Sequence, residues 1–228
     1  MNESEIKKAK SINNLAKTII GKTLLGSVPV VGTLLSTLWN EAVTYTLEQR
    51  RKNWEEIIEA RLKCIEKSVD ELARNELFIT SLLMATPIAI KTCDSQKREY
   101  LANAVINSLE ETVDESKLII FLSLMDKYTV WHIKFLIFFI ELADIKSDTL
   151  QNLKSSSDVW VGVTFTNLLS SKYPQFTDEQ EYVEKILRDL ESDGLLLQRA
   201  AFGFLKKDTI GGQRFTKLGL DFFNFITL

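Results

Sequence analysis

The chain has 228 residues, of which 45% are hydrophobic and 26% are charged, and its net charge is −3. These values are typical of an ordinary globular protein and exclude a strongly basic module specialised for nucleic acid. Three prolines and nine glycines favour long helices over a many-stranded sheet. Cys64 and Cys93 form no spaced framework, and no signal peptide is visible, so we expect a cytoplasmic protein.

Residues 4–20 carry isoleucine and alanine at helical spacing, and residues 23–40 follow without a single charge. The first stretch predicts a helix packed on a core, with a membrane-surface helix as the alternative. The second contains Gly26, Pro29 and Gly32, which favour a tight apolar turn between two buried helices. Its composition also resembles apolar stretches near the N-termini of helical pore-forming and cell-death domains. That resemblance implies a hairpin able to enter a bilayer, in a protein peripheral to the inner membrane. The hairpin would be formed by Leu24, Leu25, Val28, Pro29, Val30, Val31, Leu34 and Leu35.

From residue 34 to about residue 74 the pattern is strongly helical, and a break near residues 49–52 is the alternative to one rod. Its apolar seam consists of Trp54, Ile58, Leu62, Ile65, Val69 and Leu72. A helix from Asn75 to about Ala85 is expected to end or kink at Pro87. The next helix starts near Ser95 and turns Leu101, Ala104, Val105 and Leu109 inward. We assign residues 1–113 to an N-terminal helical bundle.

Residues 110–115 form an acidic connector, after which residues 117–125 and 130–143 predict two very apolar helices. Thr129 is expected to cap the second of these, and residues 135–140 are expected to be deeply buried. A loop-like stretch at 145–157 precedes helices predicted at 158–171 and 178–192, the latter with Thr177 as its N-cap.

Residues 186–226 give the clearest local signals. A helix ends at Asp193-Gly194, where glycine supplies a left-handed residue, and Leu195, Leu196 and Leu197 then continue as an extended segment. After a basic, glycine-containing turn, Thr216 is expected to cap a last helix that buries Leu218, Phe222, Phe223 and Ile226. The threonine and glycine of TKLG (216–219) resemble the way many bacterial winged-helix domains close. This resemblance implies a winged-helix-like domain with a small β-wing at residues 114–228.

The sequence contains no pattern that predicts catalysis, a metal site or a cofactor site. His132 is the only histidine and is interpreted as a core or boundary residue, and the carboxylate clusters are interpreted as solvated helix faces. We therefore expect a non-enzymatic protein without a cofactor.

The helix at 178–193 would be the DNA-reading helix of a winged-helix domain, but its seven acids and two bases leave a local charge of −5. That sign opposes binding to phosphates. The wing is basic and could contact a partner through Arg199, Lys206, Lys207, Arg214 and Lys217. An acidic helix beside a basic wing suits self-association or a charged protein partner.

The sequence thus predicts a mainly α-helical protein, a bundle joined to a winged-helix-like domain, that acts through protein–protein contacts or as a homo-oligomer. Two alternatives stay open. One is a membrane-permeabilising effector of cell death or antiphage defence that uses the 23–40 hairpin. The other is a DNA-binding transcriptional regulator that uses the basic wing.

Overall fold

The computed structural model describes residues 39–65, 67–110, 114–144, 169–170, 172–198 and 213–227. Within these ranges the secondary structure is helical, and the one β pairing is an isolated antiparallel bridge between Leu196 and Phe215. The predicted helix at 4–20, the hairpin residues 24–35, the loop at 145–157, the helix residues 158–168 and most of the basic wing lie outside the described residues.

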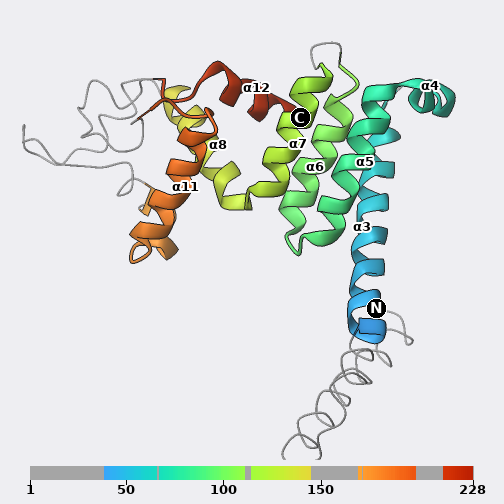
Figure 1. Ribbon diagram of the computed structural model, residues 1–228, viewed down its shortest axis with the longest axis horizontal. Coiled ribbons are helices and arrows are strands. Elements are labelled where there is room, and N and C mark those ends of the chain that lie inside the picture. Colours follow the sequence, from blue (N-terminus) through green and yellow to red (C-terminus); the bar gives the residue numbers. More distant parts are fainter. Residues whose placement is uncertain are drawn as a thin grey trace, which may run out of the picture.

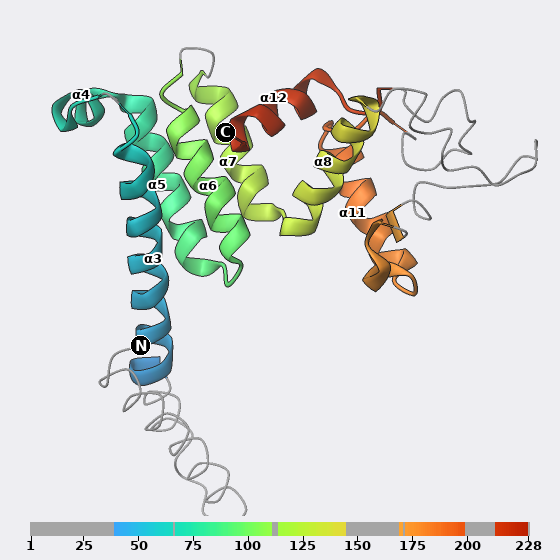
Figure 2. The same cartoon turned by 180° about the vertical axis from the view of Figure 1, so that it is seen from behind.

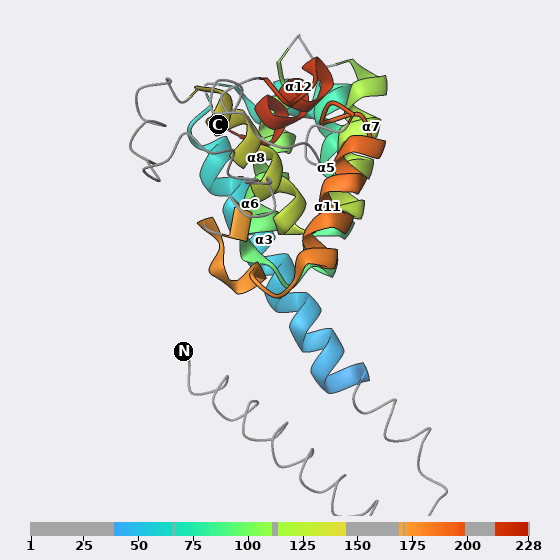
Figure 3. The same ribbon diagram turned by 90° about the vertical axis from the view of Figure 1, so that its left-hand side faces the viewer.

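The first described helix is the longest. A π-helical turn, η1 (Trp39–Val43), leads into α3 (Thr44–Leu62), which extends past the end of the bundle formed by the other helices (Figures 1 and 3). Trp54 and Ile58 are its buried residues. Two side chains fix α3 to α5 (Glu76–Lys91). Arg50 donates to the carbonyls of Ile90 and Lys91, and Trp54 Nε1 donates to Thr86 Oγ1.

The predicted rod from residue 34 to residue 74 is interrupted: α3 ends at Leu62 and the next helix starts at Val69, and no break occurs at 49–52. Ser68 and Glu71 form a capping box that starts a separate short helix, α4 (Val69–Arg74). The apolar seam consequently stops being continuous. Val69 is 81% exposed, whereas Leu72 is buried.

Two antiparallel helices follow, α5 (Glu76–Lys91) and α6 (Ser95–Asn107), capped by Asn75 and Asp94. Pro87 lies inside α5, which continues to Lys91 and does not end near Ala85, as one of the two expectations from sequence had it. Because proline has no N–H, Pro87 cannot donate to the carbonyl of Leu83 one turn earlier. Both residues are exposed to solvent, so water can bind the Leu83 carbonyl instead. The predicted inward residues of α6, Leu101, Ala104 and Val105, are fully buried.

The next two helices are α7 (Glu115–Lys127) and α8 (Val130–Asp144). Phe135, Leu136, Phe138, Phe139 and Ile140 are buried, which confirms the predicted deep burial of that run, with Ile137 only partly buried. Figures 1 and 2 show α7 beside α5 and α6, and α8 turned away toward the C-terminal helices.

The C-terminal part contains a short 3-10 turn, η2 (Pro174–Phe176), followed by α11 (Gln180–Ser192) and α12 (Lys217–Ile226). Thr177 is not the N-cap of α11. Its hydroxyl donates to the carbonyl of Pro174, and Glu179 holds the N-cap position without a side-chain cap. Tyr173 precedes this turn in a segment rich in aromatic contacts, so the chain enters α11 through a packed turn rather than a capped loop.

The predicted closing signals are confirmed. Gly194 has a φ of +74° directly after α11, and the Thr216 hydroxyl accepts from the N–H of Gly219 at the start of α12. The buried side of α12 differs in part from the expectation. Phe225 joins Phe222 and Ile226 in the core, whereas the predicted Leu218 and Phe223 are half-buried.

Helix α12 packs on α6 and α8, across the end of the bundle (Figure 3). Asn103 donates to the carbonyl of Ile226, and Asn107 donates to the carbonyl of Thr227, so two amides of α6 hold the last turn of α12. Helix α7 likewise packs on α5. These contacts cross the 113/114 boundary, and the division into domains 1–113 and 114–228 stays a prediction.

Candidate functional site

Titratable side chains converge where the α7–α8 corner meets α11. The connection between α7 and α8 is only two residues long, Tyr128 and Thr129, and α11 crosses it. We call the side chains that meet there the corner network: Lys127, Tyr128, His132, Lys185, Asp189 and Asp193. His132 and Asp189 come from elements 57 residues apart in sequence.

Tyr128 ties the corner to the C-terminal end of α11. Its hydroxyl donates to Asp193 Oδ2 at 2.7 Å, and Lys127 Nζ pairs with the same carboxylate at 2.6 Å. Burial, together with the hydrogen bond to Asp193, raises the pKa of Tyr128 far above its ordinary value. Tyr128 therefore stays protonated and acts as a donor.

His132 ties the corner to the middle of α11. The backbone N–H of Thr129 donates to Nδ1 at 3.2 Å, and the Thr129 hydroxyl lies 2.9 Å from the same atom. Because an N–H can only donate, Nδ1 is the acceptor and the ring hydrogen is on Nε2. That nitrogen lies 3.3 Å from Asp189 Oδ2 and donates to it.

The charges in this network follow from burial and pairing. Burial lowers the pKa of His132, although Asp189 acts in the opposite direction, so the imidazole is neutral near pH 7. Burial favours a higher pKa for Asp189, but hydrogen bonds from Lys185 and His132 outweigh it and place that pKa below its usual value. The ring of Tyr128 stacks on His132 with centroids 4.7 Å apart and covers the imidazole.

A buried lysine of α6 also binds the α7–α8 corner. Lys97 of α6 donates to the carbonyls of Asp126 and Tyr128, where α7 leaves its last carbonyls without helical partners. Burial lowers the pKa of Lys97. The corner is therefore held by the bundle as well as by α11.

The other end of α11 is fixed by aromatic rings. Phe176, just before α11, meets the ring of Trp131 edge-on at 4.6 Å and the ring of Phe135 at 5.7 Å. Tyr182 in the first turn of α11 packs on Phe176 at 5.8 Å. The inner side of α11 itself buries Val183, Ile186, Leu187 and Leu190.

This geometry fixes α11 against the α7–α8 corner. Both ring nitrogens of His132 and the hydroxyl of Tyr128 have protein partners, and the partners of His132 Nε2 and of the Tyr128 hydroxyl come from the α11 segment. Among the described residues, no group of three or more His, Cys, Asp or Glu side chains could hold a metal ion.

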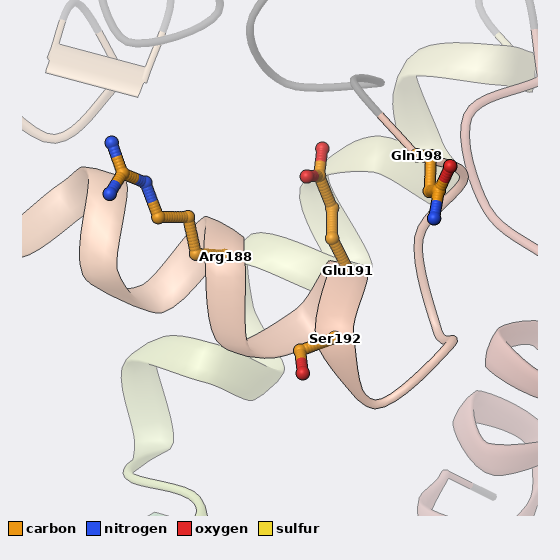
Figure 4. Close-up of a pocket in the computed structure, with 4 residues that line it drawn as sticks. All are labelled: Arg188, Glu191, Ser192 and Gln198. Carbon is orange, nitrogen blue, oxygen red and sulfur yellow. The ribbon is translucent and has the colours of Figure 1, made fainter.

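A hollow of about 330 Å³ lies at the C-terminal end of α11, lined by Arg188, Glu191, Ser192 and Gln198 (Figure 4). All four lining side chains are polar, whereas small-molecule sites are mostly apolar. Figure 4 shows Arg188 and Glu191 rising from the same side of α11, with Gln198 facing Glu191 from the segment that follows.

The residues predicted from sequence are only partly brought together. The hairpin residues and the wing residues Arg199, Lys206 and Lys207 lie outside the described part of the chain. Arg214 is half-buried beside Leu197, whose N–H donates to its carbonyl, and burial lowers the pKa of its guanidinium. Lys217 is exposed at the first position of α12.

The interpretation of the carboxylate cluster at 178–193 as a solvated helix face is wrong for two of its members. Asp189 and Asp193 turn inward, with side chains 20% and 19% exposed. Their spacing of four residues places them on one stripe beside Ile186 and Leu190, and this was the signal available in the sequence. Tyr128 and Lys127 carried no such signal, because their partners come from a distant helix.

In the described ranges, no helix is both long and apolar enough to cross a bilayer. The chain matches no protein-family model, no curated protein and no solved structure.

Proposed function

We propose that this chain is a non-enzymatic helical protein that acts through protein–protein contacts of a winged-helix-like C-terminal part. The order of elements supports this assignment. Helix α11 ends at Gly194, the chain pairs Leu196 with Phe215, and Thr216 starts the closing helix α12. A scaffold does not define a function, and the surface of α11 is what would recognise a partner.

The observation that carries the proposal is that α11 is fixed at both ends, while the residues around its N-terminus are exposed and acidic. The corner network holds the C-terminal half, and Phe176 holds the N-terminal end. Asp178, Glu179 and Glu181 are exposed there, and we call them the acidic face. A rigid surface of one charge sign speeds association with an oppositely charged partner and excludes partners of like charge.

The same acidic face argues against DNA as the partner. The reading helix of a winged-helix domain lies between phosphates, and binding gains most of its non-specific affinity when cationic groups release counterions. Of the seven acids between residues 178 and 193, two are neutralised inside the corner network. Of the remaining five, Asp178, Glu179 and Glu181 are exposed, and their charge would oppose the approach of phosphates. A cationic protein surface fits this charge.

The proposal is tested by capture from native cells with paired charge reversals. Glu179→Lys with Glu181→Lys reverses the acidic face, and Glu48→Lys with Glu56→Lys makes the same charge change on exposed positions of α3. The proposal expects one protein to be retained stoichiometrically by the wild type and the α3 variant and lost by the acidic-face variant. Equal retention by all three, or no retained protein, would contradict it. Thermal melting checks folding, because acids in the first turn of a helix also stabilise it by about 0.3–1 kcal/mol each.

A second candidate is the permeabilisation of membranes by the N-terminal stretch. One observation favours it. Helix α3 extends beyond the bundle (Figure 1). Trp39, in the π-helical turn that precedes α3, is 61% exposed and belongs to the uncharged 23–40 stretch of the sequence. An amphipathic aromatic residue at that place suits a membrane interface.

A further inference from the structure

The single histidine of the chain acts as a helix-capping side chain. His132 is the third residue of α8, and its Nδ1 accepts the backbone N–H of Thr129, the residue just before that helix. In a capping box, glutamate or glutamine usually supplies the acceptor at this position. Imidazole differs from those side chains because it takes up a proton near neutral pH, and that proton turns its acceptor nitrogen into a donor.

The closed corner is a poor place for this proton. A hydrogen on Nδ1 would point at the Thr129 N–H, which lies 3.2 Å away, so two donors would face each other. The Thr129 hydroxyl can turn to accept from the ring, but the backbone N–H then loses its partner. The new charge would also lie at the N-terminal end of α8, where the helix dipole disfavours a cation. His132 is only 7% exposed, and burial lowers its pKa.

The charged groups nearest the imidazole do not reverse this preference. Asp189 of α11 accepts from Nε2 and favours the imidazolium, but Lys185 already pairs with that carboxylate. Lys127 of α7 opposes a further positive charge, although it is itself paired with Asp193. In the described part of the chain, Asp189 is the one carboxylate that favours protonation of the ring.

The remaining elements at the corner present a lysine and an aromatic ring to it. Helix α6 contributes Lys97, which donates to the carbonyl of Tyr128. Helix α12 contributes Phe222, whose ring meets that of Tyr128 edge-on at 6.1 Å. Asp221 of α12 is paired with Lys117 of α7. Neither helix therefore offers the imidazolium an unpaired carboxylate among the described residues.

Helix α11 closes the corner over His132. Its Asp189 Oδ2 lies 3.3 Å from Nε2, and Asp193 binds Tyr128, whose ring stacks on the imidazole. When the C-terminal half of α11 moves away, the ring edge that carries Nε2 meets water and the ring is free to turn from Thr129. The imidazolium is more stable in that open arrangement, so acid shifts the equilibrium toward it.

We propose that His132 is a proton-controlled latch, in which protonation of Nδ1 breaks the cap of α8 and frees the C-terminal half of α11 from the α7–α8 corner. The latch holds α11 above about pH 6.5, where an exposed histidine is neutral, and loosens it as the pH falls below that value. The consequence for the acidic face, which loses its fixed position in acid, rests on the proposed function. The movement of α11 does not, and it is measured without a partner.

Hydrogen exchange of the full chain, followed by mass spectrometry at about pH 7 and about pH 5, tests the latch. After correction for the intrinsic exchange rate, peptides of α11 are expected to lose protection about tenfold in acid, the factor given by one unit of pKa difference. Peptides of α5 and α6 are expected to keep theirs. His132→Gln restores the usual capping side chain and does not titrate, so its α11 should stay protected at both pH values.

Three results of this experiment would overturn the proposal. Protection of α11 in the wild type could be independent of pH. It could fall equally in α5 and α6, which would mean acid unfolding of the whole chain. It could fall in His132→Gln as much as in the wild type, which would assign the pH dependence to other groups.

Nuclear magnetic resonance covers the case in which His132→Gln impairs folding. His132 is the only histidine, so the Cε1–H resonance of the wild-type protein gives its titration midpoint directly. A midpoint below about 6.5 is expected, because the closed corner binds the proton more weakly than water-exposed imidazole does. A midpoint at or above that value would overturn the proposal, since acid would then hold the corner closed.

Discussion

The substitution Gly219→Ala tests how α12 is held against the segment that follows α11. A Cβ atom at position 219 would lie 2.2 Å from the carbonyl oxygen of Leu195, which is backbone and cannot turn away. The same contact region contains two hydrogen bonds, from the N–H of Thr216 to Leu195 O and from the Thr216 hydroxyl to Gly194 O. We expect the substitution to separate these segments by about 1 Å, the distance needed to restore ordinary contact.

The expected magnitude combines three contributions. Overpacking of this kind costs about 1–3 kcal/mol, and weakening of one hydrogen bond adds about 1 kcal/mol. Replacement of glycine by alanine inside a helix returns up to about 1 kcal/mol. The net loss in the free energy of unfolding is therefore about 1–4 kcal/mol.

Urea unfolding followed by circular dichroism measures this loss, and Gly194→Ala provides a control of different physical origin. At Gly194 a Cβ meets nothing within 4 Å, but the φ of +74° is costly for any residue with a side chain. We expect about 1–2 kcal/mol there, from backbone conformation alone. A Gly219→Ala protein as stable as the wild type would refute the close approach of α12 to Leu195.

Three further predictions concern the corner network and the N-terminal stretch. Burial lowers the pKa of His132 in the folded protein from its ordinary value of 6.5, so protonation of this side chain favours unfolding. The free energy of unfolding should therefore fall as pH drops below about 6.5. His132→Gln should remove this pH dependence, as urea titrations at several pH values would show. Tyr128→Phe removes the hydroxyl that donates to Asp193 and should cost about 1–2 kcal/mol in the same assay, whereas an unchanged midpoint would mean that this bond contributes nothing. The wild-type protein should leave liposomes intact; dye leakage that Val30→Asp or Leu34→Asp abolishes in a folded protein would instead establish the membrane alternative.

The local features of this fold could be predicted because each depends on neighbouring residues. Gly194 ends α11 and Thr216 caps α12 through contacts within a few positions of each residue. The capping box of Ser68 and Glu71 was equally local, and its S-x-x-E pattern was the available sign that the long helix would break before α4. The exposed Pro87 shows the limit of such rules, since a proline is tolerated inside a helix when its missing bond faces water.

The contacts that position the candidate site could not be predicted in this way. Asn107 reaches the end of α12 across 120 residues, and Tyr128 reaches Asp193 across 65. No spacing rule links residues so far apart, and a lone aspartate on an acidic helix resembles a solvated one until its partner is placed. The stripe that Asp189 and Asp193 share with Ile186 and Leu190 could be seen in the sequence, but the partners of these two carboxylates became visible only in three dimensions.

Site-specific photo-cross-linking in native cells shows whether a protein binds the acidic face of α11. A photoreactive residue at position 181, in the acidic face, is compared with one at position 56, exposed on α3. We expect a discrete cross-linked protein from position 181 that is absent from position 56. Identical patterns from both positions, or no protein adduct at position 181, would contradict a contact surface on α11.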